Sequence, residues 1–372
     1  MYKRIIRNLV PPLLLNLRRE KLSRRNYPML DIKTWSEICK IERVGTQELE
    51  FMVENYLTSR DYRNTSKYWR YLILKNLKQI QTSGINQYGV DVARNYFTWT
   101  NFDDDVICNL FAEDNKPNDI DIFKRHEGFS MSESFRHNIL ISLLYSYLFR
   151  NGLIKEFLKL GDRGYLFGGH PHHKLGGEVL TLDKLSAMLE YQVIRNLITS
   201  DSVCVEIGAG SGRTAEAILT LVPGVSYIIA DLPPASYIAM ERLKRAFPEK
   251  RIIYVDTPDK LRDIYTKRSM WDVIFVLPSL LEVLEDKSIS IVIAIDCLHE
   301  MSNLNRSYFS DIVNHKSSFF YVKINQRTLI PLDNVLLDSD DFEEYYFLKN
   351  WKILYSENAI FPSNYRDLLF EI

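Results

Sequence analysis

Residues 203–224, VCVEIGAGSGRTAEAILTLVPG, decide the fold of this chain. A run of apolar residues ends at Ile207, glycines follow at Gly208, Gly210 and Gly212, and a helical pattern continues to Pro223. Glycine permits a sharp turn and a close approach of the backbone to a ligand. The helix behind such a turn offers unpaired N–H groups. The stretch therefore predicts a strand, a ligand-binding loop and a helix.

The rest of the C-terminal half repeats this alternation of short β-branched runs and helical patterns. Further runs lie at 225–231, 251–256, 272–278, 289–296 and 318–324, and WKILYSE and DLLFEI close the chain. Buried runs that alternate with helices predict an α/β fold with a Rossmann-like, parallel, doubly wound sheet. Ligands of such sheets bind beyond the carboxyl ends of the strands.

The N-terminal part has a different pattern. A chain of 372 residues exceeds what one compact core usually holds, so more than one domain is expected. Residues 1–160 are predicted to form a mainly helical region, with a loop in the Asp- and Asn-rich stretch 101–119. A Gly- and His-rich connector and one helix occupy 161–198, and the ligand-binding domain spans 199–372.

Composition limits the class of protein. The net charge is −1, so no overall positive field favours nucleic acid. Four cysteines without paired spacing fit a reducing cytoplasm, and no apolar run is long enough to span a membrane. Residues 1–30 carry eight basic side chains and one acid. They predict either a peripheral contact with the inner face of a membrane or a helix with a solvated basic face.

An acid at the end of the first strand separates two ligand classes. A dinucleotide fingerprint needs a third glycine where Arg213 stands, and a pyrophosphate would meet the carboxylate of Glu206. A ligand with a cationic group suits Glu206 better. The pattern E-x-G-x-G-x-G resembles motif I of class I S-adenosyl-L-methionine (AdoMet) methyltransferases, whose cofactor carries an ammonium and a sulfonium. Asp231, which ends the second strand, is placed to accept the ribose hydroxyls.

The adenine is expected against the residues that follow one of two runs. DVIFVLP is preferred as the third core strand because it leads through one short helix to the strand ending at Asp296, and Asp256 after RIIYVD is the alternative. The predicted cofactor contacts are Glu206, Gly208, Ala209, Gly210, Gly212, Arg213, Asp231, Leu232, Leu277, Pro278, Ser279 and Asp296.

Motifs along nearly the whole chain resemble the sugar O-methyltransferases encoded with bacterial polysaccharide and glycoside biosynthesis. They are RNLVPPLLLNLRR, DIKTWSEI, GGHPHH, LEYQVI, EIGAGSGR, the DLP after strand two, CLHEM and YFSDIVNHKSSFFYVKIN. The resemblance implies a class I methyltransferase domain and a sugar or glycan acceptor. The sequence departs from the family pattern at Cys297, where serine is expected, and in the histidine-rich connector.

The segment DCLHEM, residues 296–301, lies where the transferred methyl group of this fold points. A sugar hydroxyl must lose its proton as it attacks, and a neutral histidine suits that task. His299 is therefore predicted as the general base, with Glu300 orienting it or holding the acceptor. The alternative is that His299 and Glu300 only cap or start a helix.

The connector histidines offer a second source of a base or of acceptor contacts. His170, His172 and His173 are predicted to bind the acceptor, and the alternative is metal-assisted transfer through them, although no metal site is predicted. An NAD(P)-dependent oxidoreductase is the competing class. The N-terminal region is expected to select the acceptor, cover the site or form a homo-oligomer. The expected product is S-adenosyl-L-homocysteine (AdoHcy).

Overall fold

The computed structural model describes residues 28–41, 45–87, 104–113, 120–126, 129–267, 270–326, 328–330, 335–337 and 351–372. The predictions for the basic segment 1–30, including its Pro-Pro-Leu run, fall almost entirely on residues 1–27, outside the described residues. In the part that is described, no helix has both the length and the apolar character needed to cross a membrane.

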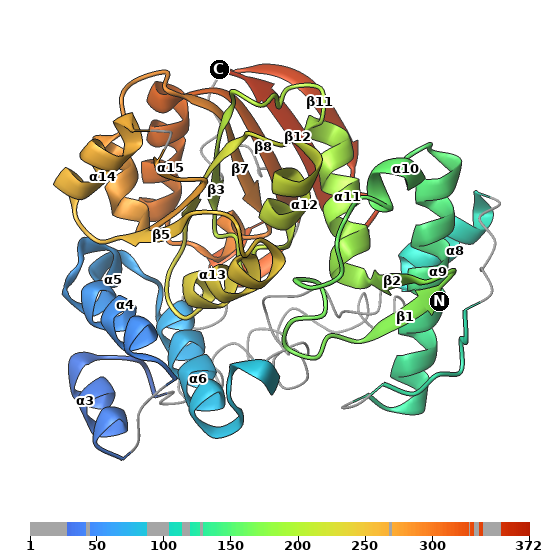
Figure 1. Cartoon of the computed structure of the whole chain (residues 1–372), viewed down its shortest axis with the longest axis horizontal. Helices are drawn as coiled ribbons and strands as arrows, with labels where there is room; N and C mark the ends of the chain where they lie inside the picture. The colour runs from blue at the N-terminus through green and yellow to red at the C-terminus, as the bar shows by residue number, and fades with distance from the viewer. Residues whose placement is uncertain are drawn as a thin grey trace.

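A sheet of eight strands forms the centre of the C-terminal half (Figure 1). Its order is β11-β12-β8-β7-β3-β4-β6-β5. The strands are β3 (Val203–Ile207), β4 (Ser226–Ala230), β5 (Ile252–Val255), β6 (Val273–Val276), β7 (Ile289–Ile295), β8 (Ser317–Asn325), β11 (Lys352–Asn358) and β12 (Tyr365–Glu371). The six strands from β3 to β8 pair in parallel, which confirms the predicted doubly wound α/β sheet.

The last two strands depart from a purely parallel sheet. β12 is antiparallel to both β8 and β11. Only residues 359–364 separate β11 from β12, which is too short for the crossover that parallel strands need. The two strands therefore form a hairpin at one edge of the sheet.

Helices cover both faces of the sheet because strand residues alternate between two cores. Cys204 packs with the cluster that includes helices α11 (Leu182–Ile194), α12 (Arg213–Leu221) and α13 (Ala235–Ala246). Its neighbours Val203 and Val205 pack with the cluster of α14 (Pro258–Thr266) and α15 (Asn303–Lys316). Figure 1 shows α12 and α13 on one side of the strands and α14 and α15 on the other.

The N-terminal region shares the first of these cores. Its helices are α3 (Ile32–Ile41), α4 (Gln47–Thr58), α5 (Arg60–Asn64), α6 (Lys67–Ser83), α8 (Asp104–Ala112), α9 (Met131–Arg150) and α10 (Ile154–Phe157), with the short η1 (Ile85–Gln87). Buried residues from Leu30 to Leu160 belong to the same apolar cluster as α11 and the sheet. The N-terminal helices thus pack directly on the sheet domain.

Two local expectations need correction. The stretch 101–119 was expected to be a loop, but it contains α8, because Val106 and Leu110 lie one turn apart and are both buried. The connector 161–178 is not simply a flexible loop, because it ends in the hairpin of β1 (His172–Leu175) and β2 (Glu178–Thr181). A second short hairpin joins β9 (Thr328–Ile330) and β10 (Val335–Leu337).

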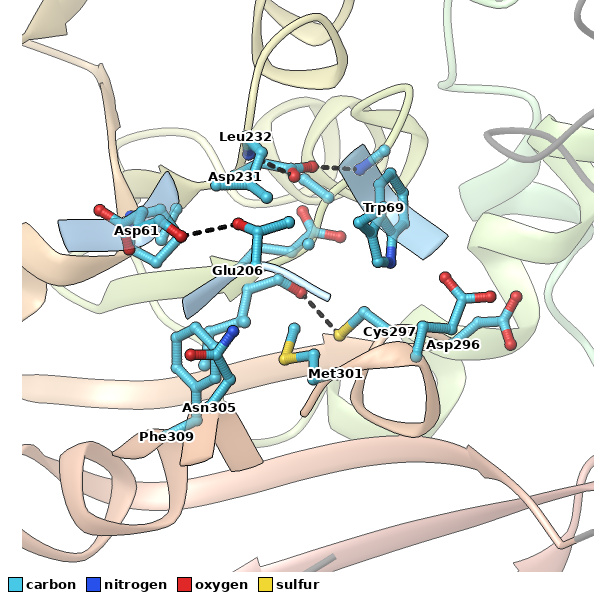
Figure 2. A pocket seen from close by; sticks show the side chains of 18 of the residues that line it. Asp61, Trp69, Glu206, Asp231, Leu232, Asp296, Cys297, Met301, Asn305 and Phe309 are labelled. Atoms are coloured by element: carbon cyan, nitrogen blue, oxygen red, sulfur yellow. Dashed lines mark hydrogen bonds between the residues drawn. The ribbon is translucent and has the colours of Figure 1, made fainter. Parts of the chain in front are cut away.

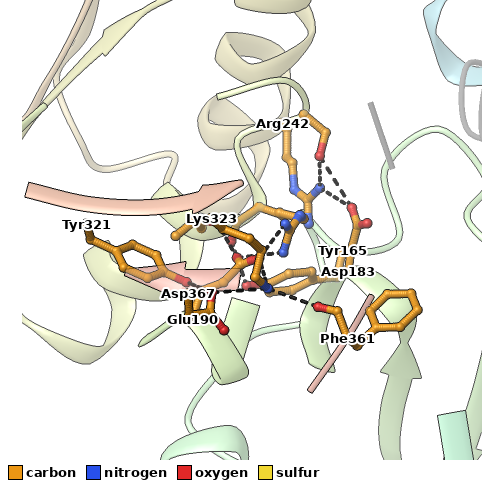
Figure 3. Close-up of polar contacts among 11 residues, drawn as sticks. Tyr165, Asp183, Glu190, Arg242, Tyr321, Lys323, Phe361 and Asp367 are labelled. Carbon is orange, nitrogen blue, oxygen red and sulfur yellow. Dashed lines mark hydrogen bonds and ion pairs between the residues drawn. The ribbon is translucent and has the colours of Figure 1, made fainter. Parts of the chain in front are cut away.

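Buried ion pairs join α11 to the sheet domain (Figure 3). Both guanidinium NH groups of Arg213 donate to Glu190 of α11 at 2.7 Å, and Lys323 of β8 donates to the same carboxylate at 3.2 Å. Two turns away on α11, Asp183 accepts from Arg242 at 2.8 Å. Arg242 also donates to Glu216 at 2.7 Å. These pairs fix the position of Arg213 at the start of α12, next to the glycine loop.

Candidate active site

A cavity of about 670 Å³ lies at the carboxyl ends of the central strands (Figure 2). Its wall is formed by the segments that follow β3, β4, β6 and β7, by Tyr365 of β12, and by residues 60–69 of the N-terminal region. Eleven of the predicted site residues line it: Glu206, Gly208, Ala209, Gly210, Arg213, Asp231, Leu232, Pro278, Asp296, His299 and Glu300.

The glycine loop turns under the cavity with a geometry that side chains would block. Gly208 has φ of +66°, and a Cβ there would lie 2.6 Å from the Cβ of Cys297. Gly212 has φ of +75°, and its Cβ would lie 3.0 Å from that of Ala239 in α13. Gly212 does not line the cavity, so its absence of a side chain serves helix packing. The sequence pattern predicted a glycine turn between β3 and α12, which the structure contains, but it could not separate these two roles.

Two buried carboxyl groups flank the loop. Glu206 accepts a hydrogen bond from the hydroxyl of Tyr227 at 2.8 Å, and burial raises the pKa of Glu206 to about 8. Asp231 accepts from the backbone N–H groups of Gly210 at 2.9 Å and Leu232 at 2.6 Å. Burial raises the pKa of Asp231 to about 7 in spite of these two bonds. Both groups become ionised most readily when a cation or hydroxyl donors enter the cavity.

The order of the strands in the sheet shows which of the two runs, RIIYVD or DVIFVLP, forms the inner strand. β6 pairs directly with β4, and β5 is the outer strand, as the preference for DVIFVLP over RIIYVD predicted. Pro278 after β6 lines the cavity, whereas its neighbours Leu277 and Ser279 do not. Ser279 instead bonds to Asp61 of α5 through its backbone N–H at 3.0 Å and its hydroxyl. The alternative residue Asp256 pairs with Lys260 and is also outside the lining.

The end of β7 brings an imidazole between two acids. Asp296 has φ of +53°, and the short 3-10 helix η4 (Leu298–Glu300) follows. His299 Nε2 lies 3.6 Å from Asp296 Oδ1 and 3.5 Å from Glu300 Oε1. Helix α15 begins only at Asn303, so His299 and Glu300 precede that helix instead of starting it. Their side chains face the cavity wall.

Burial disfavours the charged form of each of these three groups. It lowers the pKa of His299 to about 3, raises that of Asp296 to about 7, and raises that of Glu300 well above its usual range. Three of their atoms, Asp296 Oδ1, His299 Nδ1 and Glu300 Oε2, have no hydrogen-bond partner among the described residues. Buried polar atoms are nearly always paired with protein or with ordered water, so these three atoms are available to a polar ligand or to water.

The side chain of Cys297 holds two strand ends together. Its thiol donates to the backbone carbonyl of Ile207 at 3.2 Å, and burial raises its pKa well above the usual value. A thiol held in this way is a poor nucleophile. It ties the end of β7 to the end of β3 directly below the cavity.

The N-terminal wall of the cavity was not identified from the sequence. Asp61 bonds to Ser279, Arg60 pairs with Glu282 and lies 5.2 Å from the ring centre of Tyr308, and Asn305 donates to the carbonyl of Asn64 at 3.2 Å. These partners are more than two hundred residues apart in the chain. No local pattern in the helices α5 and α6 signals that they contact the sheet domain.

The connector histidines lie away from the cavity, and none of the three is part of its lining. His170 is buried with Nε2 4.0 Å from Asp183. His173 Nε2 is 2.7 Å from Asn138 Oδ1, which His126 Nε2 also approaches at 2.7 Å, and His172 is half-buried in β1. Over the described part of the chain, no group of three or more His, Cys, Asp or Glu side chains is arranged to hold a metal ion.

The comparisons with known proteins give only distant similarities. No family model matches the sequence, and no curated protein is significantly similar to it. Among solved structures, the chain is similar to the mitomycin 7-O-methyltransferase MmcR with 14% identity and a TM-score of 0.33, over 50% of this chain and 54% of that one. The matched part therefore spans about half the length of MmcR.

Two further similar structures have equally low scores. A SAM-dependent methyltransferase from Aquifex aeolicus matches with 10% identity and a TM-score of 0.31, over 49% of this chain and 88% of that one. Fibrillarin from Aeropyrum pernix, with natively bound S-adenosyl-L-methionine, matches with 12% identity and a TM-score of 0.36, over 57% and 86%. These identities and TM-scores are too low to assign a function to this chain.

Proposed function

We propose that the chain is an AdoMet-dependent O-methyltransferase that acts on a hydroxyl of a sugar or glycan precursor. One observation carries the proposal. A single cavity contains a glycine cradle with two buried carboxyl groups at one set of strand ends, and a buried imidazole with an unpaired nitrogen at another. The first set suits a cationic nucleoside, and the second suits proton removal from a hydroxyl.

The residues around the glycine loop fit the proposed cofactor. Glu206 offers a carboxylate to the ammonium group, and Asp231 keeps free lone pairs on both oxygens for the ribose hydroxyls. Leu232 and Pro278 offer apolar surface to the adenine. When bound, the cofactor supplies an electrophilic methyl group on a sulfonium. A pyrophosphate would meet the buried acid Glu206, which disfavours the nicotinamide alternative.

His299 is the proposed base. It is neutral at physiological pH, and its unpaired Nδ1 can accept the hydroxyl proton while Asp296 and Glu300 flank Nε2. A base with a pKa near 3 is weak, so the protonated imidazole needs an ionised neighbour, and Asp296 with a pKa of about 7 is the nearest group able to ionise. Asp296 is also the second candidate base, because its own pKa is better matched to that task.

Calorimetric titration with AdoHcy and with NAD⁺ tests the cofactor assignment. We expect AdoHcy to bind and NAD⁺ not to bind, and binding of NAD⁺ alone would contradict the proposal.

His299→Ala is expected to lower turnover about a hundredfold or more while AdoHcy affinity stays unchanged. His315→Ala, an exposed position on α15, is the matched control.

The two candidate bases predict different effects of substitution, although both require an ionised Asp296 and therefore an acid limb near pH 7. If His299 receives the proton with Asp296 ionised beside it, both His299→Ala and Asp296→Asn abolish turnover. If Asp296 is the base, His299→Gln retains most of the activity and the acid limb near pH 7 remains. Activity that survives both substitutions and disappears with EDTA would favour metal-assisted transfer instead.

A further inference from the structure

The part of the cavity next to Asp296 and Glu300 is completed by the first turn of α6. Trp69 lines the cavity, and its indole N–H donates to the carboxyl group of Glu300. The hydroxyl of Ser66 lies 3.4 Å from the backbone carbonyl of Glu300 and donates to it. In Figure 2, Trp69 lies on the same side of the cavity as Asp296 and Cys297, and Asp61 lies on the other side.

Tyr68, the neighbour of Trp69 in the first turn of α6, also lies close enough to the acid pair for its pKa to respond to their charges. Burial raises the pKa of the Tyr68 phenol, and the charges of Glu300 and Asp296 raise it further. Tyr68 and Trp69 are consecutive in the first turn of α6, so this turn approaches both acids. Asp296 and Glu300 also carry the unpaired oxygens described above. Glu300 is only 6% exposed to solvent.

An aromatic ring beside unpaired buried polar atoms suits a specific kind of ligand. An indole ring offers a broad apolar surface with a negative face, which attracts the weakly positive C–H groups of a saturated ring. The acids and the imidazole offer acceptors and donors for hydroxyl groups. A pyranose ring has this combination, with C–H groups on its faces and hydroxyls around its rim.

We propose that Trp69, supplied by the N-terminal region, is a specificity-determining residue of an acceptor subsite made with Asp296, His299 and Glu300. Its indole face packs on the pyranose ring, and its N–H holds Glu300 in position to bind a ring hydroxyl. This proposal rests on the proposed function, because it assigns the acceptor half of the same cavity. It gives the N-terminal helices a direct role in recognition.

The test uses the full chain and a defined set of acceptors. Radiolabelled methyl transfer from AdoMet is measured to the methyl glycosides of D-glucose, D-mannose, D-galactose and L-rhamnose. Trp69→Ala is expected to raise the acceptor KM about tenfold or more, since it removes the stacking surface, while AdoHcy affinity is unchanged. Trp69→Phe keeps an aromatic face and is expected to keep KM within about threefold of wild type.

Trp351→Ala is the matched control. Trp351 is also a partly buried tryptophan with a hydrogen-bonded indole, which donates to Asn314 at 3.1 Å, but it does not line the cavity. Its loss is expected to leave KM unchanged. If Trp69→Ala does not fold, Trp69→Leu takes its place, because leucine keeps apolar volume and lacks the aromatic face.

Each outcome separates this inference from the proposed function. An unchanged acceptor KM in a folded Trp69→Ala or Trp69→Leu variant would overturn the role of Trp69. A wild-type protein that binds AdoHcy but neither binds nor methylates any of the glycosides would overturn the sugar subsite and leave the cofactor assignment standing. Failure of the wild type to bind AdoHcy would overturn the proposed function itself.

Discussion

The raised pKa of Glu206 predicts that cofactor affinity increases with pH. In the free protein, burial raises this pKa to about 8, so most molecules carry a neutral Glu206 at pH 7. A bound ammonium group favours the carboxylate and lowers the pKa in the complex. The complex therefore binds fewer protons than the free protein, and binding strengthens as pH rises towards the pKa of the free state.

The size of the effect follows from that value. If the ligand binds only the ionised form, raising the pH from 6 to 8 increases affinity about fiftyfold, or roughly 2.3 kcal/mol. Asp231, with a pKa of about 7, adds at most about a further tenfold over the same interval. Near pH 7, binding is expected to release close to one proton from Glu206.

Isothermal titration calorimetry with AdoHcy at pH 6, 7 and 8 measures the affinity directly. Repeating it at pH 7 in two buffers of different ionisation enthalpy counts the released protons. Glu206→Gln can still accept from Tyr227, but it is expected to bind more weakly at pH 8 and to show a flatter pH dependence. Glu285→Gln, at an exposed position outside the cavity, is the control. Affinity that is constant or decreases with pH in the wild type would refute the reasoning.

Three further predictions concern the loop, the ion pairs and the buried histidines. Gly208→Ala is expected to abolish AdoHcy binding, because its Cβ would lie 2.6 Å from that of Cys297. Gly176→Ala, with a similar positive φ in an open hairpin turn, is expected to bind normally; equal binding by both variants would contradict this account. Glu190→Gln removes the buried anion that Arg213 and Lys323 share, and it is expected to reduce the free energy of unfolding by about 3–5 kcal/mol in urea, against at most about 0.5 kcal/mol for Glu285→Gln. Burial lowers the pKa values of His126, His137 and His173, that of His173 to about 4, so the folded protein binds fewer protons than the unfolded chain below about pH 6.5 and loses stability as the pH falls towards 4. His137→Phe is expected to reduce the loss of Tm between pH 7.5 and 5 and His315→Gln to leave it unchanged, whereas a pH-independent Tm in the wild type would contradict the prediction.

The sheet domain could be predicted because its pattern is local. Inner strands buried on both faces appear as short continuous apolar runs. Each of the eight predicted runs forms a strand, including the exposed edge strand β11. The antiparallel direction of β12 was missed because strand direction depends on the length of the connection and not on the composition of the strand. Helix α8 was missed because the acidic residues around it outweighed the buried pair Val106 and Leu110.

The strand-end residues of the cavity were also accessible from the sequence. Glu206, Gly208 and Asp231 lie at strand ends, where topology alone brings them together, and the structure places all three on the cavity. Asp61 and Trp69 could not be found in this way, since their positions depend on how two helices pack on a sheet formed far later in the chain. The connector histidines misled because clustering in sequence does not imply a shared cavity.

The ion pairs of α11 also determine how this helix docks on the rest of the chain. Asp183 and Glu190 face different cations, Arg242 for the first and Arg213 with Lys323 for the second. Sliding the helix along its axis by one turn, about 5.4 Å, would separate both acids from their partners and leave the charges in an apolar interior. Apolar contacts alone would tolerate such a shift far better, because they are not directional and are similar from one helical turn to the next. The charged pairs thus fix the position of α11 along its own axis, and α11 is the helix on which the glycine loop rests.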